Sequence, residues 1–253
     1  MAKIMAVVTQ KGGVGKTTSA VNIAAALGEM GKKCLLVDID PQGNATSGVG
    51  VDKRTVKQST YDLLMGETDG SKAVQRTPFD NLSIIPASVA LAGAEIDMVD
   101  VPHREKRLKA ALAPCREQFD FILIDCPPAL GLLTLNALVA ADTFLIPAQP
   151  EYYALEGLSD LMSTLRLMKK RLNPALDIFG VVLTMFDGRT NFSTQVAQEV
   201  RRHFPGKVYA TVVPRNIRLA EAPSHGLPVT AYDRSSKGAQ AYRAIAQEVI
   251  KKG

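Results

Sequence analysis

The sequence predicts an α/β fold built on a mostly parallel, twisted sheet with helices on both faces. Two observations predict it. Short apolar runs rich in β-branched residues alternate with segments of helical periodicity along nearly the whole chain, which is typical of parallel strands covered on both sides. A glycine-rich loop directly follows the first of these runs and leads into a helical segment, an arrangement that can hold an anion.

The first expected strand is 4–8, IMAVV, and the loop TQKGGVGKTT at 9–18 follows it. The glycines of the loop let backbone N–H groups turn toward one anion. A helix that begins near Lys16 and runs through Met30 adds its positive N-terminal end. The first strand and its loop therefore predict a phosphate-binding site.

The loop departs from the common phosphate-loop pattern G-x-x-x-x-G-K-[ST]. Gln10 stands where the first glycine is expected, and a second lysine, Lys11, stands next to it. Lys16 is placed for the β- and γ-phosphates of a nucleotide, and the Thr17 hydroxyl for Mg²⁺. The loop residues expected to bind the nucleotide are Gly12, Gly13, Val14, Gly15, Lys16, Thr17 and Thr18.

The second expected strand, 34–40, ends in Asp38 and Asp40, which are followed by Pro-Gln-Gly. Alternation along a strand points both carboxylates the same way, off the end of the sheet. We expect Asp40 to orient or deprotonate an attacking water, because it lies beyond the apolar run and nearer the loop. Asp38 is expected to support the loop or the metal. A purely structural turn is the alternative for both residues.

The polar stretch 50–80 is expected to be a partly irregular surface excursion before the third strand, 82–87. The fourth strand, 121–127, reads FILIDCP and ends in Asp125 before two prolines that stop it. A carboxylate at this place predicts a Walker B aspartate that holds Mg²⁺ through water. The simpler alternative is an aspartate that caps a turn.

The rest of the chain continues the alternation. Three more strands are expected at 143–148, 178–184 and 208–214. Helical spacing predicts helices at 131–141, 154–172, 192–204 and 236–252. No composition break and no internal repeat divides the sequence, so we expect one domain over residues 1–253.

The composition is that of an ordinary globular protein. Of the 253 residues, 46% are hydrophobic and 22% are charged, which is enough for a large core. No run approaches the roughly 20 apolar residues that span a bilayer, and the N-terminus does not resemble a signal peptide. Cys34, Cys115 and Cys126 are widely separated and show no metal-binding spacing, so we expect buried thiols in a reducing cytoplasm.

Positive charge gathers in the last quarter of the chain. The net charge is +5, but residues 189–253 hold eleven Lys and Arg against four Asp and Glu. The first 188 residues therefore carry a net charge of −2. Such a distribution indicates a surface for polyanions or an ordinary solvated face.

Four motifs together resemble one family. KGGVGKTT, DIDPQGN, ILIDCPP and PRNIRLAEAPSHG are similar to the deviant Walker A ATPases, and within them to the ParA/Soj chromosome- and plasmid-partitioning ATPases. The resemblance covers residue 3 to about residue 250. It implies a P-loop NTPase fold, ATP and Mg²⁺ as ligands, and slow, partner-stimulated ATP hydrolysis. The position of the loop fits the short chromosomal type.

The resemblance also implies a role for the second lysine. Lys11 matches the signature lysine, which crosses the interface of an ATP-sandwich homodimer and touches the phosphates bound by the partner subunit. ATP would then favour the dimer and ADP the monomer, because only ATP offers the terminal phosphate. Asp40 matches the catalytic carboxylate of the family. The residues expected to carry catalysis are Lys11, Lys16 and Asp40.

Further nucleotide contacts follow from the same resemblance. The segment PRN matches the adenine-binding stretch, and a methionine before it is expected against the base. A loop in AQPEYYALEG matches the one that reaches the partner's nucleotide. The residues concerned are Pro214, Arg215, Asn216, Met185, Pro150 and Glu151.

The family's dimer binds double-stranded DNA without sequence preference, through arginines that match Arg189 and Arg218. Further candidates in the basic quarter are Lys237, Lys251 and Lys252, for each of which a solvated surface role is the alternative. No recognition-helix pattern accompanies them, so sequence-specific readout is not expected. The implied partners are a ParB/Spo0J-type protein and the replication initiator DnaA, and the implied location is the cytoplasm, on the nucleoid.

Three other classes are alternatives. MinD-type ATPases bind membranes through a C-terminal amphipathic helix, but the last helix here lacks the large apolar residues of an interfacial helix. We expect it to pack on the sheet, with no stable membrane association. An iron–sulfur reductase would need cluster-binding cysteines at a dimer interface, which the positions of Cys34 and Cys115 disfavour. A scaffold without turnover is disfavoured by Lys16, Asp40 and Asp125.

Overall fold

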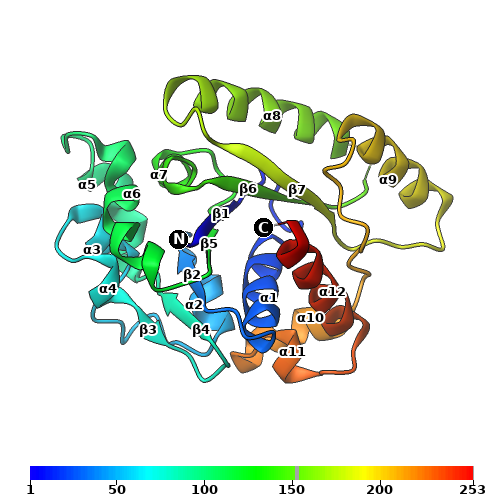
Figure 1. The fold of residues 1–253 in the computed structure, drawn as a ribbon, viewed down its shortest axis with the longest axis horizontal. Helices are drawn as coiled ribbons and strands as arrows, with labels where there is room; N and C mark the ends of the chain where they lie inside the picture. The colour runs from blue at the N-terminus through cyan, green and yellow to red at the C-terminus, as the bar shows by residue number, and fades with distance from the viewer. Residues whose placement is uncertain (152–153, 253) are drawn as a thin grey trace.

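A computed structural model describes residues 1–151 and 154–252 of the chain, and a seven-stranded sheet lies at its centre (Figure 1). The strand order is β3-β4-β2-β5-β1-β6-β7. The strands are β1 (Lys3–Val7), β2 (Cys34–Asp38), β3 (Gln75–Arg76), β4 (Leu82–Ile85), β5 (Phe121–Asp125), β6 (Thr143–Ala148) and β7 (Asp177–Leu183). Every neighbouring pair is parallel except β3 and β4. The predicted α/β class is therefore confirmed.

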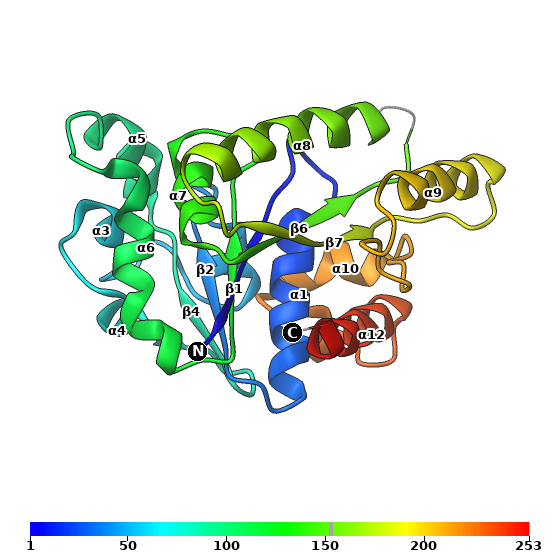
Figure 2. The ribbon, with the colours of Figure 1, turned by 45° about the horizontal axis from the view of Figure 1, so that its top comes forward.

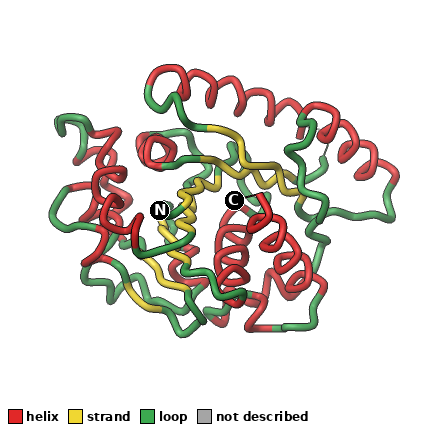
Figure 3. Tube along the Cα trace, viewed as in Figure 1, coloured by secondary structure: helices red, strands yellow, loops and turns green. Residues whose placement is uncertain are grey.

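Helices cover both faces of this sheet (Figures 2 and 3). The α-helices are α1 (Lys16–Glu29), α2 (Asn44–Gly48), α3 (Thr60–Met65), α4 (Gly70–Ala73), α5 (Ala94–Asp97), α6 (Arg107–Leu112), α7 (Leu132–Ala140), α8 (Ala154–Arg171), α9 (Asn191–His203), α10 (Ile217–Glu221), α11 (Val229–Tyr232) and α12 (Lys237–Lys252). Short 3₁₀ helices are η1 (Val89–Gly93), η2 (Arg104–Lys106), η3 (Ala113–Glu117) and η4 (Ala222–His225). The long helices predicted from spacing are confirmed to within two residues at each end.

Two apolar clusters, one on each face, hold the layers together. On one face, Met5 and Val7 of β1 pack with the buried sides of α1 and α12. On the other face, Ile4 and Ala6 pack in a cluster that includes residues of α6, α7 and α8. Both sides of the strand are buried, which is why the strands read as continuous apolar runs. Each fully buried aliphatic side chain contributes about 1.5–3 kcal/mol.

The register of the central strands brings their carboxyl ends together. Val7 at the end of β1 pairs with Asp125 at the end of β5, and Asp38 at the end of β2 pairs with the same Asp125. The loops that follow these three strands therefore leave the sheet at one edge. This is the edge at which the sequence predicted a site.

The expected strand at 208–214 is wrong. The segment pairs with β7 and the turn after it through two isolated bridges, Val181 with Val208 and Phe186 with Pro214, and through one further bond from the Val213 N–H to the Leu183 carbonyl at 2.8 Å, without forming a continuous ladder. Between these bridges the N–H groups of Ala210 and Thr211 donate to the carboxylate of Glu248 on α12, at 3.0 and 2.9 Å. A side chain thus takes the backbone donors that a continuous ladder would need.

The stretch 50–80 is more ordered than we expected. It contains α3, α4 and β3, and it buries Leu63 and Leu64 in the core. A capping box of Ser59 and Asp62 starts α3, and the Thr60 hydroxyl donates to the Asp38 carbonyl at 2.7 Å. The expectation of a surface excursion is therefore wrong for α3, which packs against the core next to the end of β2.

The last helix, α12, buries one of its faces against the rest of the molecule. Tyr242, Ile245 and Val249 are buried in the cluster that includes α1 and the sheet, as expected for a core helix. Its Tyr242 hydroxyl lies 3.1 Å from the Ser19 hydroxyl of α1. Among the described residues, no helix is both long enough and apolar enough to cross a membrane.

Candidate functional site

The loop between β1 and α1 takes the conformation that its glycines allow. Gly13 and Gly15 have φ angles of 75° and 83°, in the left-handed region that other residues rarely adopt. Gly15 lies directly before the first residue of α1, Lys16. The Thr184 hydroxyl, just beyond β7, donates to the Val14 carbonyl at 2.7 Å and so ties the loop to the neighbouring strand end.

A cavity of about 340 Å³ lies over this loop. Residues predicted from the sequence that line it are Lys11, Gly12, Gly13, Gly15, Lys16, Thr17, Thr18, Asp40 and Met185. Three other lining residues escaped the sequence analysis: Gln42, Asn44 and Pro128. They follow Asp40 and Asp125 within a few positions, and the motifs DIDPQGN and DCPP held the only signal for them.

Lys16 is buried between two carboxylates. Its Nζ lies 3.5 Å from Asp125 Oδ1 and 3.7 Å from Asp40 Oδ2. The three side chains are at most 9% exposed, so each charge depends on the others for compensation. Burial raises the pKa of Asp125 above its ordinary value, although the charge of nearby Lys16 opposes the rise. The arrangement concentrates positive and negative groups where a phosphate and a metal ion could meet.

The oxygen atoms available at the site suit a Mg²⁺ ion. Asp125 Oδ2 is buried and accepts no hydrogen bond from any described residue, which leaves an acceptor free toward a metal-bound water. Within residues 1–151 and 154–252, no group of three or more His, Cys, Asp or Glu forms a metal cage. Mg²⁺ commonly needs only one or two protein ligands beside phosphates and waters, so Asp125 and Thr17 suit it.

Asp38 has a structural position that differs from that of Asp40. Its Oδ2 accepts hydrogen bonds from the Thr46 N–H and hydroxyl, both at 2.7 Å, and its Oδ1 accepts one from the Asp40 N–H at 3.2 Å. Burial and the charge of Asp125 raise the pKa of Asp38. The hydrogen-bond partners of Asp38 lie in the segment that follows β2 and not in the phosphate-binding loop at 9–18, so the contacts favour the purely structural turn role that the sequence left as the alternative for Asp38.

A second cavity, of about 350 Å³, adjoins the first across Gly15, Thr18 and Met185. The segment predicted to bind adenine lines it through Pro214, Arg215 and Asn216. Met185 has a φ angle of 51°, a left-handed conformation that is uncommon outside glycine and often marks a functional turn.

Six lining residues of this second cavity were missed from the sequence: Thr184, Val213, Ile217, Leu219, Ala220 and Tyr242. Thr184 directly follows β7, and Tyr242 comes from α12. The sequence predicts that the helix carrying Tyr242 packs on the sheet, and nothing in the local pattern separates a cavity-lining tyrosine from a core one.

Lys11 lies at the exposed side of the first cavity. Its Nζ forms an ion pair with Glu151 of the same chain, and the two side chains are 53% and 41% exposed. Both residues were assigned by resemblance to contacts with a partner's nucleotide. In the single chain they are neighbours, 140 positions apart in sequence.

The basic residues predicted to bind DNA lie in exposed positions, but both arginines form ion pairs with acidic side chains of the same chain. Arg189 makes a bidentate pair with Asp187 at 2.9 and 2.8 Å, which lowers the pKa of Asp187 to about 2. Arg218 pairs with Glu221 and Asp233. The exposed lysines of α12 are Lys237, Lys251 and Lys252, of which the last lies over the Tyr209 ring at 4.0 Å.

The chain is similar to known proteins over its whole length. The family described as AAA domain (AAA_31) matches residues 2–178. Sporulation initiation inhibitor protein Soj of Bacillus subtilis is 55% identical over 253 residues, covering 100% of both chains. Chromosome-partitioning ATPase Soj of Treponema pallidum is 49% identical over 250 residues, 99% of this chain and 98% of the relative.

A solved structure adds the same likeness in three dimensions. Cobyrinic acid a,c-diamide synthase from Mycobacterium smegmatis superposes with a TM-score of 0.86 at 37% identity, covering 99% of this chain and 95% of that one. It was solved with ADP and magnesium and with an ATP analogue and magnesium.

Proposed function

The chain belongs to the ParA/Soj family of chromosome-partitioning ATPases, and from this premise we propose that it is a Mg²⁺-dependent ATPase switch in chromosome or plasmid partitioning. The observation that carries the proposal is the buried Lys16 between Asp40 and Asp125 at the start of α1. A buried cation with two carboxylates at a glycine-rich loop suits a triphosphate and its metal ion.

Binding is assigned to the loop and its neighbours. Backbone N–H groups of residues 12–15 and the N-terminus of α1 hold the phosphates. Lys16 turns from the carboxylates to the β- and γ-phosphates, and Thr17 and Asp125 would hold the Mg²⁺ ion. A bound Mg²⁺ neutralises charge on the β- and γ-phosphate oxygens. The base lies in the cavity at Pro214–Asn216.

Hydrolysis is assigned to Asp40. Its Oδ1 accepts the Gln42 N–H at 3.0 Å, which holds the side chain, and its own backbone N–H donates to Asp38, which holds the backbone at this position. The Oδ2 atom faces Lys16 at 3.7 Å. Once Lys16 has moved to the phosphates, Asp40 is free to orient or deprotonate the attacking water.

Assembly and DNA binding are assigned to the exposed residues. Lys11 leaves Glu151 and reaches the phosphates of a second copy, so that an ATP-bound homodimer forms. This dimer binds double-stranded DNA through Arg189, Arg218 and the lysines of α12 without reading sequence. A ParB/Spo0J-type protein stimulates hydrolysis, contact with DnaA is a further partner role, and the protein resides on the nucleoid.

A paired binding assay tests this proposal. The protein is mixed with duplex DNA of arbitrary sequence or with anionic vesicles, each without nucleotide, with ADP and with ATP plus Mg²⁺. We expect ATP-dependent retention on DNA and none on vesicles, with slow phosphate release. Retention on vesicles alone would replace the DNA role with that of a membrane-bound positioning ATPase. Absence of ATP hydrolysis in every condition would contradict the switch itself.

A further inference from the structure

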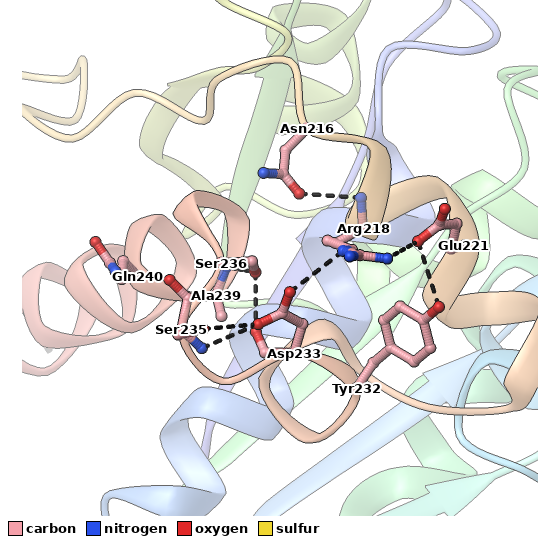
Figure 4. Close-up of polar contacts among 9 residues, drawn as sticks. All are labelled: Asn216, Arg218, Glu221, Tyr232, Asp233, Ser235, Ser236, Ala239 and Gln240. Carbon is pink, nitrogen blue, oxygen red and sulfur yellow. Dashed lines mark hydrogen bonds and ion pairs between the residues drawn. The ribbon is translucent and has the colours of Figure 1, made fainter.

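Arg218 lies in an ion-pair network that joins separate segments of the C-terminal quarter (Figure 4). Its Nη1 donates to Glu221 Oε2 at 2.8 Å, and its Nε lies 3.3 Å from Asp233 Oδ2. The guanidinium therefore faces two carboxylates at once. The Arg218 side chain is 47% exposed, so an anion from solution can reach the same group.

Both carboxylates are held by donors other than Arg218. The Tyr232 hydroxyl donates to Glu221 Oε2 at 3.3 Å, and the Tyr232 ring stacks on His225 with 5.0 Å between centroids. Asp233 Oδ1 accepts the N–H and the hydroxyl of Ser235 at 3.2 and 3.0 Å (Figure 4). Carboxylates fixed in this way lose little freedom when they pair, which strengthens a network over an isolated surface pair.

The short helix that carries Arg218, α10, also lines the second cavity. The Asn216 side chain caps the N-terminus of α10 by accepting the Arg218 N–H at 3.0 Å. Asn216 and Leu219 both line the cavity assigned to the base. Leu219 packs against Gly238 of α12, where an added Cβ would lie 2.8 Å from the leucine Cγ. A base in the cavity would therefore touch the helix that carries Arg218.

We infer that Glu221 and Asp233 are intramolecular competitors of DNA phosphate for Arg218, and that nucleotide in the adjoining cavity weakens this competition through α10. The inference rests on the proposed function, because it requires Arg218 to contact DNA. A phosphate must displace two carboxylates before it can pair with the guanidinium. The nucleotide-free chain thus holds its DNA-binding arginine in a neutralised state.

Variants that remove the negative charge of either acid but keep the shape of its side chain test the inference. Glu221→Gln and Asp233→Asn keep the side-chain size and an acceptor oxygen but lose the negative charge. Binding of the full chain to a short duplex of arbitrary sequence is measured by fluorescence anisotropy at moderate salt. We expect each variant to tighten nucleotide-free binding about two- to five-fold, the range for a partly exposed pair. The gain should be smaller with ATP and Mg²⁺.

Two controls separate this effect from a general loss of negative charge. In an Arg218→Ala background the gain from Glu221→Gln should disappear, because the carboxylate has lost the group it competes for. Glu199→Gln provides a matched acid, since Glu199 pairs with Arg202 three residues away and is 40% exposed against 35% for Glu221. It should tighten binding less than Glu221→Gln does.

The outcomes distinguish the inference from the proposed function. If Arg218→Ala weakens DNA binding but neither acid variant tightens it, the competition is overturned and the DNA role stands. A gain that persists without Arg218 overturns it as well. If the wild type binds no DNA in any nucleotide state, both ideas are overturned.

Nucleotide affinity of each variant reports whether it is folded. Should an acid variant fail that control, Tyr232→Phe removes only one hydroxyl that fixes Glu221. It should shift DNA affinity in the same direction by a smaller factor, and an unchanged affinity would overturn the competition.

Discussion

At the sheet edge beside the β1–α1 loop and in the basic C-terminal quarter, a cation is paired with two carboxylates. The two places differ in how deeply the charges are buried. At the edge, Lys16 lies between Asp40 and Asp125, with all three side chains buried. In the C-terminal quarter, Arg218 lies between Glu221 and Asp233, with all three partly exposed. In each place a cation that we assign to phosphate is paired with two carboxylates of its own chain.

The difference in burial decides what each pairing can do. Breaking a buried pair by removing one partner leaves an uncompensated charge and costs about 3–5 kcal/mol. Exposed pairs contribute little and are screened by salt. The buried cluster is therefore expected to respond in an all-or-none way to mutation, whereas the exposed pairs adjust an affinity in small steps. The following substitutions test this contrast.

Lys16→Ala should have the largest effect. It removes the phosphate cation and leaves Asp40 and Asp125 buried beside the phosphates, so nucleotide affinity should fall by roughly two to three orders of magnitude. Titration calorimetry with an ATP analogue and Mg²⁺ measures it. Lys72→Ala is the matched control, because Lys72 pairs with Asp69 at an exposed site and should bind as the wild type does. Tight binding by Lys16→Ala would remove the loop assignment.

Asp40→Ala should separate binding from turnover. Loss of a positioned general base lowers the rate by about 10²–10⁴-fold, while the loop still binds ATP, so the ATP-bound state should accumulate. Phosphate release under saturating ATP measures the rate. Asp52→Ala, which removes an exposed acid paired with Arg54, should leave it unchanged. Wild-type turnover in Asp40→Ala would exclude Asp40 from the mechanism.

Arg189→Ala combined with Arg218→Ala should have the smallest effect and act only on DNA. Each lost phosphate contact should reduce the slope of log affinity against log salt by about 0.9, and ATP binding should be unaffected. Filter binding over a series of salt concentrations measures the slope. Arg54→Ala, at an exposed pair in the first quarter of the chain, is the control. An unchanged slope in the double variant would move the DNA surface elsewhere.

Features carried by local pattern could be predicted from the sequence. The loop, the strand that ends in Asp125 and the long helices depend on residues within one run of the chain, and the structure has them in the expected places. Asp38 and Asp40 were assigned to one strand end, but the contact that distinguishes them comes from Thr46. That contact forms because α2, which carries Thr46, lies next to the end of β2.

Features that depend on distant side chains could not be predicted. The expected strand at 208–214 is interrupted because Glu248, more than thirty positions later, accepts the N–H groups of Ala210 and Thr211. The pairings of Lys11 with Glu151 and of Arg218 with Asp233 could not be predicted either, since charge counts place Arg218 in a basic region without showing Asp233 beside it. Residue type and order predict which groups are present, whereas the fold decides which of them meet.

The central claim is that the terminal phosphate of ATP joins two copies through Lys11. The direct test is the mass of the protein in solution without nucleotide, with ADP and with ATP plus Mg²⁺, in the Asp40→Ala background so that hydrolysis does not intervene. We predict a dimer with ATP only, and a monomer in all three conditions when Lys11→Ala is added, although that variant still binds ATP. A protein that remains monomeric in saturating ATP and Mg²⁺ with Lys11 intact would contradict the account.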